Sequence, residues 1–205
     1  MDTPNKISII ILAAGLSERF KGNKLLVKID GVPLIRKTVE IYLETNPYEI
    51  IVVVGYEQDK IKSALKGLKI KFVFNKKFKE GQGSSVITGI LSTNKDSDGY
   101  LFGLADQPFV SKETINKLID SFYIDGNVRT LIVAPFQEEK RGNPVLFSSQ
   151  LRDKLLKIVG DKGARDIYKK INDKFPLAIK KVKVKEINTF YDFDTKQDFE
   201  NYGIN

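Results

Sequence analysis

The stretch that most constrains the fold is an apolar run near the N-terminus, residues 7–12, which stops at Ala13-Ala14-Gly15. A continuous apolar run of this length predicts a strand buried on both faces, as in a parallel sheet covered by helices. The small residues that follow allow backbone N–H groups to approach a ligand, and Ser17, Arg19 and Lys24 come next. Backbone donors and positive charge at the carboxyl end of a strand suit a triphosphate. The sequence therefore predicts a phosphate-binding loop after the first strand.

Two common phosphate-binding loops do not fit this stretch. A Walker loop requires a glycine, four residues and then Gly-Lys-Ser/Thr, but Gly15 and Gly22 are too far apart and Leu25 follows Lys24. A dinucleotide-binding turn requires Gly-x-Gly-x-x-Gly, and only Gly15 is available at that turn. Both a P-loop NTPase and a Rossmann dehydrogenase are therefore disfavoured.

The rest of the chain alternates strand-like and helix-like segments, which predicts a mostly parallel sheet with helices on both faces. No linker, repeat or low-complexity segment interrupts this pattern, so we expect one α/β domain over residues 1–205, a three-layer α/β/α arrangement. The expected strands are 7–12, 50–54, 70–74, 100–104, 131–135 and a lysine-rich edge strand at 180–185, and the expected helices begin near Pro33, Gln58, Val86, Ser111 and Asp166.

The composition restricts the possible chemistry. The 205 residues include no cysteine and no histidine, which excludes thiolate catalysis, Ser-His-Asp hydrolysis and cysteine or histidine metal sites. A catalytic metal would therefore be Mg²⁺ or Mn²⁺, held by carboxylates. The net charge of +8 is spread along the chain, which favours an anionic small substrate over nucleic acid. The polar N-terminus and the short apolar run predict a cytoplasmic protein with no membrane partner.

A second buried strand, 100–104, is followed by Asp106-Gln107-Pro108. Ligands of open α/β sheets bind at the carboxyl ends of the strands, so we expect Asp106 to face the same crevice as the phosphate-binding loop. A carboxylate opposite a triphosphate requires a cation between them, which makes Asp106 a candidate metal ligand. The alternative interpretation is that Asp106 caps a turn.

A glycine and serine segment, Glu80 to Ser85, precedes a helical run. One interpretation is a glycine loop with a serine N-cap. The other is that Gly83, Ser84 and Ser85 contact the base or sugar of a nucleotide through flexible backbone and helix N–H groups.

These motifs resemble those of the nucleotidyltransferases related to the molybdenum cofactor guanylyl- and cytidylyltransferases, the MobA/MocA-like family. The first family motif is matched by residues 12–15, Ser17, Arg19, Phe20 and residues 24–26. Gly22 lies one position later in this chain than the glycine of the family motif. The resemblance extends in order to Phe199. The later matches are Gly-x-Gly-Ser-Ser at 81–85, Leu-x-Asp-Gln-Pro at 104–108, Arg-Gly-Asn-Pro at 141–144 with Asn143 in place of the usual histidine, Gly-Asp-x-Gly-Ala-Arg at 160–165, and Asp192-Phe193-Asp194-Thr195 with Lys196 in place of the usual proline.

The resemblance implies the nucleotide-diphospho-sugar transferase type of fold, a Rossmann-like sheet, and transfer of a nucleotide with release of pyrophosphate. It implies that Leu12 to Gly15 and Ser17 bind phosphates, that Arg19 and Lys24 stabilise charge, and that Asp106 and Asp194 hold Mg²⁺ or Mn²⁺. Asp192 is an alternative to Asp194, which is also an N-cap candidate. Gln107, Asn143 and Arg165 are expected on the acceptor side.

Within the family, Ala13-Ala14 and Gln107 resemble the cytidylyl branch, so CTP and molybdopterin are the favoured substrates. The alternatives are a guanylyltransferase on the same acceptor, or a nucleotidyltransferase that acts on a phosphosugar or a phosphorylated alcohol. A non-catalytic nucleotide-binding domain is a further alternative, but such a domain has no need for the metal carboxylates.

Overall fold

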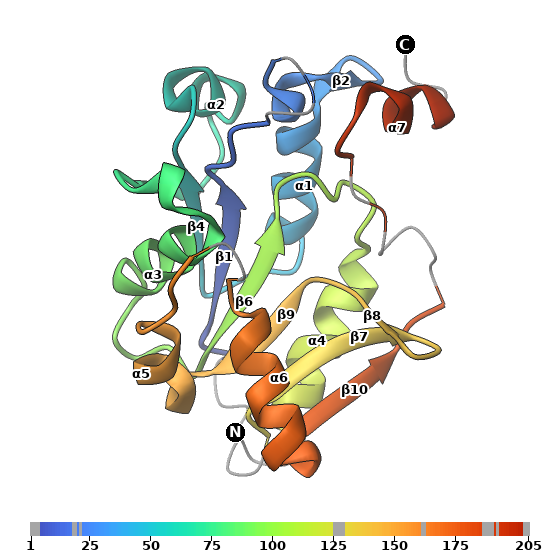
Figure 1. Cartoon of the computed structure of the whole chain (residues 1–205). Helices are drawn as coiled ribbons and strands as arrows, with labels where there is room; N and C mark the ends of the chain where they lie inside the picture. The colour runs from blue at the N-terminus through green and yellow to red at the C-terminus, as the bar shows by residue number, and fades with distance from the viewer. Residues whose placement is uncertain are drawn as a thin grey trace.

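The computed structural model describes residues 5–17, 20, 22–124, 130–160, 163–185, 191 and 193–202. Its main feature is an eight-stranded sheet with the order β10-β7-β9-β6-β1-β4-β5, in which β8 pairs with β7 (Figure 1). The strands are β1 (Ile7–Ala13), β4 (Glu49–Val54), β5 (Lys71–Phe74), β6 (Gly99–Leu104), β7 (Ile132–Gln137), β8 (Lys140–Arg141), β9 (Val145–Ser148) and β10 (Ile179–Lys183).

The sheet is mostly parallel. Strand β1 pairs in parallel with β4 on one side and β6 on the other, β4 with β5, and β10 with β7. Strand β9 pairs antiparallel with both β6 and β7, and the short β8 pairs antiparallel with β7. The predicted mostly parallel sheet is confirmed, and the lysine-rich strand β10 lies at its edge, as expected.

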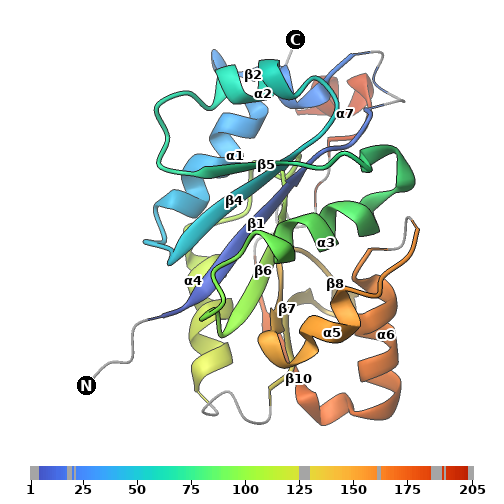
Figure 2. The ribbon, with the colours of Figure 1, turned by 90° about the vertical axis from the view of Figure 1, so that its left-hand side faces the viewer.

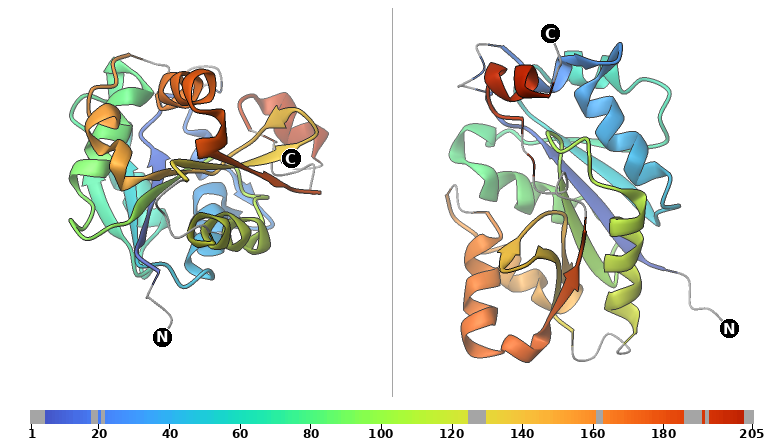
Figure 3. Two further views of the ribbon diagram at one scale, coloured as in Figure 1. Left: turned by 90° about the horizontal axis from the view of Figure 1, so that it is seen from below. Right: turned by 90° about the vertical axis from the view of Figure 1, so that its right-hand side faces the viewer.

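Helices cover both faces of this sheet (Figure 2). Helices α1 (Leu34–Leu43) and α4 (Lys112–Tyr123) lie on one face, and α3 (Gln82–Leu91), α5 (Arg152–Leu155) and α6 (Arg165–Lys174) lie on the other (Figure 3). Helix α2 (Gln58–Ala64) packs beside α1, and α7 (Lys196–Asn201) lies beyond the carboxyl ends of β1 and β6 (Figure 1). Shorter elements are the β2 (Lys28–Ile29) and β3 (Val32–Pro33) hairpin and the 3-10 turns η2 (Lys24–Leu26), η3 (Phe78–Glu80), η4 (Ser149–Leu151) and η5 (Pro176–Ala178).

Strand β1 contributes to both halves of the core. Ile9 and Ile11 pack into the cluster under α1 and α4, while Ile10 packs into the cluster under α3 and α6. All three side chains are fully buried. Because alternate residues of a strand point to opposite faces, an uninterrupted apolar strand requires cover on both sides, and the helices supply it.

The five predicted helices are all present and differ from the prediction mainly at their starts, whereas α5 has no counterpart in the prediction. Helix α3 begins at Gln82, before the predicted start at Val86, because Gly81 adopts a φ of 97° at the N-cap and allows a sharp entry into the helix. Helix α4 begins after Ser111, whose side chain accepts a hydrogen bond from Thr114 N, as predicted. Among the described helices, none has both the length and the apolar character required to cross a bilayer.

Candidate active site

The carboxyl ends of β1 and β6 lie next to each other and open into a large cavity. Leu12 is in register with Leu104, and Ala105 N donates to Leu12 O at 3.2 Å, so the residues after the two strands lie at one edge of the sheet. The cavity has a volume of about 550 Å³. Its lining residues are Leu12 to Ser17, Lys24, Leu25, Phe78 to Gln82, Ser85, Leu104, Asp106 and Asp194.

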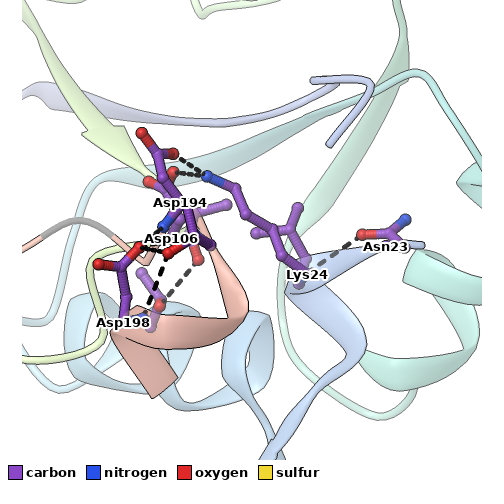
Figure 4. Close-up of polar contacts among 9 residues, drawn as sticks. Asn23, Lys24, Asp106, Asp194 and Asp198 are labelled. Carbon is purple, nitrogen blue, oxygen red and sulfur yellow. Dashed lines mark hydrogen bonds and ion pairs between the residues drawn. The ribbon is translucent and has the colours of Figure 1, made fainter. Parts of the chain in front are cut away.

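Three charged side chains from distant parts of the chain meet in this cavity (Figure 4). The Nζ atom of Lys24 lies 2.6 Å from Oδ2 of Asp106 and 2.6 Å from Oδ1 of Asp194. Lys24 and Asp106 are mostly buried, with 13% and 18% of their side chains exposed, whereas 46% of the Asp194 side chain is exposed. One ammonium group therefore lies between two carboxylates. The sequence placed Asp106 at this edge of the sheet, but it did not indicate that Lys24 pairs with Asp106 and Asp194.

The local structure around Lys24 directs its side chain into the cavity. Asn23 caps η2 by accepting a hydrogen bond from Leu25 N at 3.2 Å, and the Leu25 side chain is buried in the core. Leu34 N donates to Val27 O at 2.8 Å, which ties the end of η2 to the start of α1. These contacts fix the backbone on both sides of Lys24.

The two carboxylates control the pKa of Lys24. Burial alone would lower the pKa of the ammonium, but attraction to Asp106 and hydrogen bonds to Asp106 and Asp194 outweigh it and raise the pKa above its ordinary value. Lys24 is therefore charged throughout the physiological pH range.

Asp194 reaches the site through the segment before α7. Phe193 is fully buried, and its backbone N–H donates to Asp106 O at 3.4 Å, which joins this segment to the end of β6. The Phe193 ring contacts Phe109, Phe199 and Tyr202, with centroid distances of 5.7, 4.6 and 5.4 Å. This aromatic cluster holds the C-terminal segment against the carboxyl edge of the sheet.

The prediction that Asp194 doubles as a helix N-cap is wrong. The N-cap of α7 is Thr195, which forms a capping box with Asp198. Oδ2 of Asp198 accepts hydrogen bonds from Asp194 N at 2.9 Å and Thr195 N at 2.6 Å (Figure 4). Because Asp198 satisfies these donors, the Asp194 carboxylate is directed at Lys24. Asp192 lies outside the described residues.

The predicted phosphate-binding loop forms one wall of the cavity. Leu12, Ala13, Ala14, Gly15 and Ser17 all line it. A side chain at Gly15 would meet no atom within 4 Å, so open space lies beside the backbone there, and Ser17 adopts a left-handed φ of 53°. Between Leu12 and Leu16 the lining residues are Ala13, Ala14 and Gly15, whose small size allows a phosphate chain to approach the backbone. Arg19, predicted to bind phosphate, lies outside the described residues.

Another part of the lining comes from residues that the sequence did not single out for binding, Phe78, Lys79 and Gln82. Phe78 is held close to the phosphate-binding loop because Gly55 has no side chain: a Cβ atom at Gly55 would lie 2.7 Å from Phe78 Cβ and 2.9 Å from Ala14 Cβ. Gly55 follows β4, and its missing side chain permits this close approach, but nothing near Phe78 in the sequence indicates the contact.

The glycine and serine segment is arranged differently from the prediction. Ser85 lines the cavity, but Gly83 and Ser84 do not. Gly83 N donates to Gly160 O at 3.1 Å, and Ser84 Oγ donates to the carbonyls of Lys77 and Gly81. The buried Asn75 amide donates to both serine hydroxyls, at 2.8 Å to Ser84 and 3.0 Å to Ser85. Gly83 and Ser84 therefore build the wall behind Ser85.

A second, smaller cavity of about 50 Å³ adjoins the large one and shares Leu12, Gln82 and Leu104 with it. Asn143 and Arg165, predicted on the acceptor side, both line it, and so does Arg141. Gln107, the third residue predicted there, is only 2% exposed and lines neither cavity.

The acidic residues of the large cavity fit a divalent cation. No group of three or more metal-ligating His, Cys, Asp or Glu side chains occurs among the described residues. Asp106 and Asp194 nevertheless direct oxygens at one point, where the Lys24 ammonium already supplies positive charge. Mg²⁺ is commonly bound by one or two carboxylates together with substrate phosphates and water, so this donor set is sufficient.

Comparison with known proteins gives the family. Residues 9–175 match a model of the MobA-like NTP transferase domain. The chain belongs to this family.

A bacterial protein matches most of the chain. The bifunctional protein GlmU of Francisella tularensis subsp. holarctica (strain OSU18) is 31% identical over 173 residues, which are 82% of this chain and 36% of GlmU. The chain thus spans about a third of the length of that relative.

Two solved structures have the same fold. A nucleotidyl transferase from Methanothermobacter thermautotroptrophicus superimposes with a TM-score of 0.82 and 23% identity, over 97% of this chain and 96% of the other. Rv0371c of Mycobacterium tuberculosis, in a complex with manganese, superimposes with a TM-score of 0.78 and 20% identity. The match covers 96% of this chain and 97% of Rv0371c. At these identities the likeness establishes the fold.

Proposed function

We propose that this member of the MobA-like family is a metal-dependent nucleotidyltransferase, in which a phosphorylated acceptor attacks the α-phosphorus of a nucleoside triphosphate and pyrophosphate leaves. The observation that carries the proposal is the convergence of Asp106, Asp194 and Lys24 in a 550 Å³ cavity whose other wall is a small-residue loop. A cavity of this size suits a nucleotide, and its charged centre suits the phosphates.

Each part of the site has a role in this reaction. The backbone N–H groups of Ala13 to Gly15 and the hydroxyl of Ser17 bind the phosphate chain. Lys24, with Arg19 as its proposed partner, stabilises negative charge on the α-phosphate and on the leaving pyrophosphate. An acceptor phosphate is already an anionic nucleophile, so the reaction needs no general base, which is consistent with a chain that contains no histidine.

Asp106 and Asp194 are the proposed ligands of Mg²⁺ or Mn²⁺. A divalent cation, when bound, neutralises charge on the phosphate oxygens and orients them for in-line displacement. The structure of Rv0371c with manganese supports this choice of metal. Lys24 keeps both carboxylates directed at the same point, so the site is organised before substrates bind.

The favoured substrates are CTP and molybdopterin. The support is the resemblance of Ala13-Ala14, the Gly81 to Ser85 segment and Gln107 to the cytidylyl branch of the family. Guanylyl transfer to the same acceptor is the main alternative, and transfer to a phosphosugar or a phosphorylated alcohol is the next. The Gly81 to Ser85 wall of the cavity is where the base would be read, because Gly81, Gln82 and Ser85 line it.

A substrate screen tests this proposal. The protein is incubated with Mg²⁺ and CTP, GTP, UTP or ATP, with and without molybdopterin, and pyrophosphate release and thermal stabilisation are measured. We expect CTP to stabilise the protein most, and pyrophosphate release to require molybdopterin. Selective use of GTP would assign the guanylyl reaction. Nucleotide binding without turnover on any phosphorylated acceptor would contradict catalysis and indicate a nucleotide-binding domain.

A further inference from the structure

The small cavity beside the nucleotide cavity contains two arginine side chains, Arg141 and Arg165. Arg141 lies at the end of β8, and its guanidinium carbon is 4.4 Å from the centroid of the Tyr168 ring. Arg165 is the first residue of α6 and is exposed at the rim of the cavity. Within the described part of the chain, neither guanidinium forms an ion pair with a carboxylate.

This arrangement is electrostatically unfavourable without an anion. Burial lowers the pKa of the Arg141 guanidinium, the Tyr168 hydroxyl opposes this shift, and the nearby positive charge of Arg165 lowers the pKa further. Two like charges that face one cavity repel each other, and Arg141 also loses part of its hydration. A bound anion would remove both costs, because guanidinium groups bind oxyanions through paired hydrogen bonds.

The position of the two arginines separates their ligand from the nucleotide. Neither side chain lines the large cavity. The small cavity shares Leu12, Gln82 and Leu104 with the large one, so a group bound there lies beside the large cavity. If the large cavity holds the nucleotide, the small cavity holds part of the second substrate.

The surrounding residues keep the two arginines in place. The Tyr168 ring lies against Arg141, and Tyr168 belongs to the same helix as Arg165, one turn further along. At the start of this helix, Gly163 lets the chain approach α3, because a Cβ atom there would lie 2.6 Å from Gln82 Oε1. Both cationic groups are thus coupled to the wall that divides the two cavities.

We propose that Arg141 and Arg165 bind a phosphoryl group of the acceptor, and that Asn143 contributes a neutral hydrogen bond beside them. This inference rests on the proposed nucleotidyl transfer to a phosphorylated acceptor and deepens it by naming the residues that bind the phosphoryl group of the acceptor. A phosphoryl group has enough terminal oxygens to accept hydrogen bonds from both guanidinium groups at once, whereas one carboxylate is satisfied by a single bidentate arginine.

Binding of inorganic phosphate, with acetate as the carboxylate probe, tests the inference. Isothermal titration at constant ionic strength compares the wild type, Arg141→Gln, Arg165→Gln and Lys140→Gln, with Mg²⁺ and saturating CTP present to fill the nucleotide cavity. Lys140 is the matched control, because it precedes Arg141, is exposed and lines neither cavity. If Arg141→Gln does not fold, the phosphate affinity of Arg165→Gln alone decides the outcome.

We expect the wild type and Lys140→Gln to bind phosphate in the presence of CTP and to bind acetate more weakly. Each arginine variant should bind phosphate at least about tenfold more weakly, the loss expected for a charge-assisted hydrogen bond pair. Phosphate affinity within about twofold of the wild type in both variants would overturn the proposal, as would tighter binding of acetate than of phosphate.

The nucleotide titration keeps this test separate from that of the proposed function. Failure of the wild type to bind CTP, GTP, UTP or ATP with Mg²⁺ would contradict nucleotidyl transfer. The four proteins are then titrated with phosphate alone, and unchanged affinity in the arginine variants would overturn the anion site. Normal CTP binding and turnover with unchanged phosphate affinity would overturn the anion site only.

Discussion

At the scale of single residues, the site depends on the charge of Lys24. Its ammonium group contacts Asp106 and Asp194 at 2.6 Å each, so it holds two carboxylates that would otherwise repel each other. The same ammonium is well placed to meet the phosphates of a nucleotide. Lys24 therefore has a structural role in the free protein and a catalytic role in the proposed reaction.

Replacement of Lys24 by methionine separates these two roles. We expect Lys24→Met to reduce turnover by about 10²- to 10³-fold, because a positive charge at the reacting phosphates is lost. In the absence of nucleotide, Mg²⁺ should raise the melting temperature of this variant more than that of the wild type, because the ammonium no longer competes with the metal for Asp106 and Asp194. Differential scanning fluorimetry measures the shift.

Lys37→Met is the matched control, because it removes an exposed ion pair with Asp30 outside the cavity. Its response to Mg²⁺ should equal that of the wild type. An equal Mg²⁺ response in Lys24→Met and Lys37→Met would contradict competition between the ammonium and the metal for these carboxylates.

The raised pKa of Lys24 predicts the direction of one pH effect. A group with a higher pKa in the folded state binds its proton more tightly there, so its contribution to stability is complete below the ordinary lysine pKa of 10.5. The contribution is lost as the pH rises through the higher pKa of the folded protein. Chemical unfolding should show the wild type losing its advantage over Lys24→Met above pH 10.5 and keeping it at pH 8. A constant difference between pH 8 and pH 11 would contradict this account.

At the scale of elements, helix α7 positions Asp194. Asp198 accepts hydrogen bonds from the backbone of Asp194 and Thr195 and from the Thr195 hydroxyl, at 2.9, 2.6 and 2.8 Å. Asp198→Ala should destabilise the helix by about 1 kcal/mol, the usual cost of a lost cap, and should weaken Mg²⁺-dependent nucleotide binding by releasing Asp194. Titration calorimetry with CTP and Mg²⁺ measures the second effect.

Gln197→Ala tests whether α7 acts through Asp198 in particular. Gln197 is exposed on the same helix, and its Nε2 donates a hydrogen bond to Asn201 Oδ1 at 3.2 Å, away from Asp194. It should bind Mg²⁺ and CTP as the wild type does. A loss of affinity as large as that of Asp198→Ala would show that general loosening of α7, rather than the cap, affects the site.

The elements differ in how well the sequence predicted them. Strands β1 and β6 could be predicted because a continuous apolar run indicates a strand that is buried on both faces. Asp106 follows directly after β6, so its place at the edge of the sheet could be predicted as well. The cap of α7 was assigned to the wrong residue because Asp194 and Thr195 are both good N-caps, and the choice depends on the position of the Asp198 carboxylate. The wall at Phe78 depends on contact between segments that are distant in sequence, so no local pattern indicates it.

The pair of Arg141 and Arg165 likewise could not be predicted from local sequence patterns. Each residue lies in a separate family-like motif, and the sequence suggested an acceptor role for Arg165 only. Their common cavity arises because β8 and the start of α6 lie near the same end of the sheet (Figure 1). Two charged side chains meet in one cavity only through the tertiary fold. The sequence therefore indicated the motifs that contain Arg141 and Arg165, but not that the two side chains share a cavity.

At the scale of the whole molecule, the sheet brings two adjoining cavities to its carboxyl edge. The lining of the larger one includes Lys24 between Asp106 and Asp194, and the smaller one contains two arginines. The net charge of +8 attracts anionic substrates to the molecule as a whole. The mixed charges of the larger cavity suit a metal and a triphosphate, and the purely positive charges of the smaller one suit a phosphorylated acceptor.

The most direct test of the account is whether Asp106 and Asp194 confer metal dependence. Titration calorimetry and pyrophosphate release compare the wild type, Asp106→Asn, Asp194→Asn and the exposed control Asp120→Asn on α4, with and without Mg²⁺. We predict tighter CTP binding with Mg²⁺ in the wild type and the control, and a loss of this effect with at least about a 10²-fold drop in turnover in both site variants. Turnover within about twofold of the wild type in Asp106→Asn and Asp194→Asn would contradict the proposed metal site.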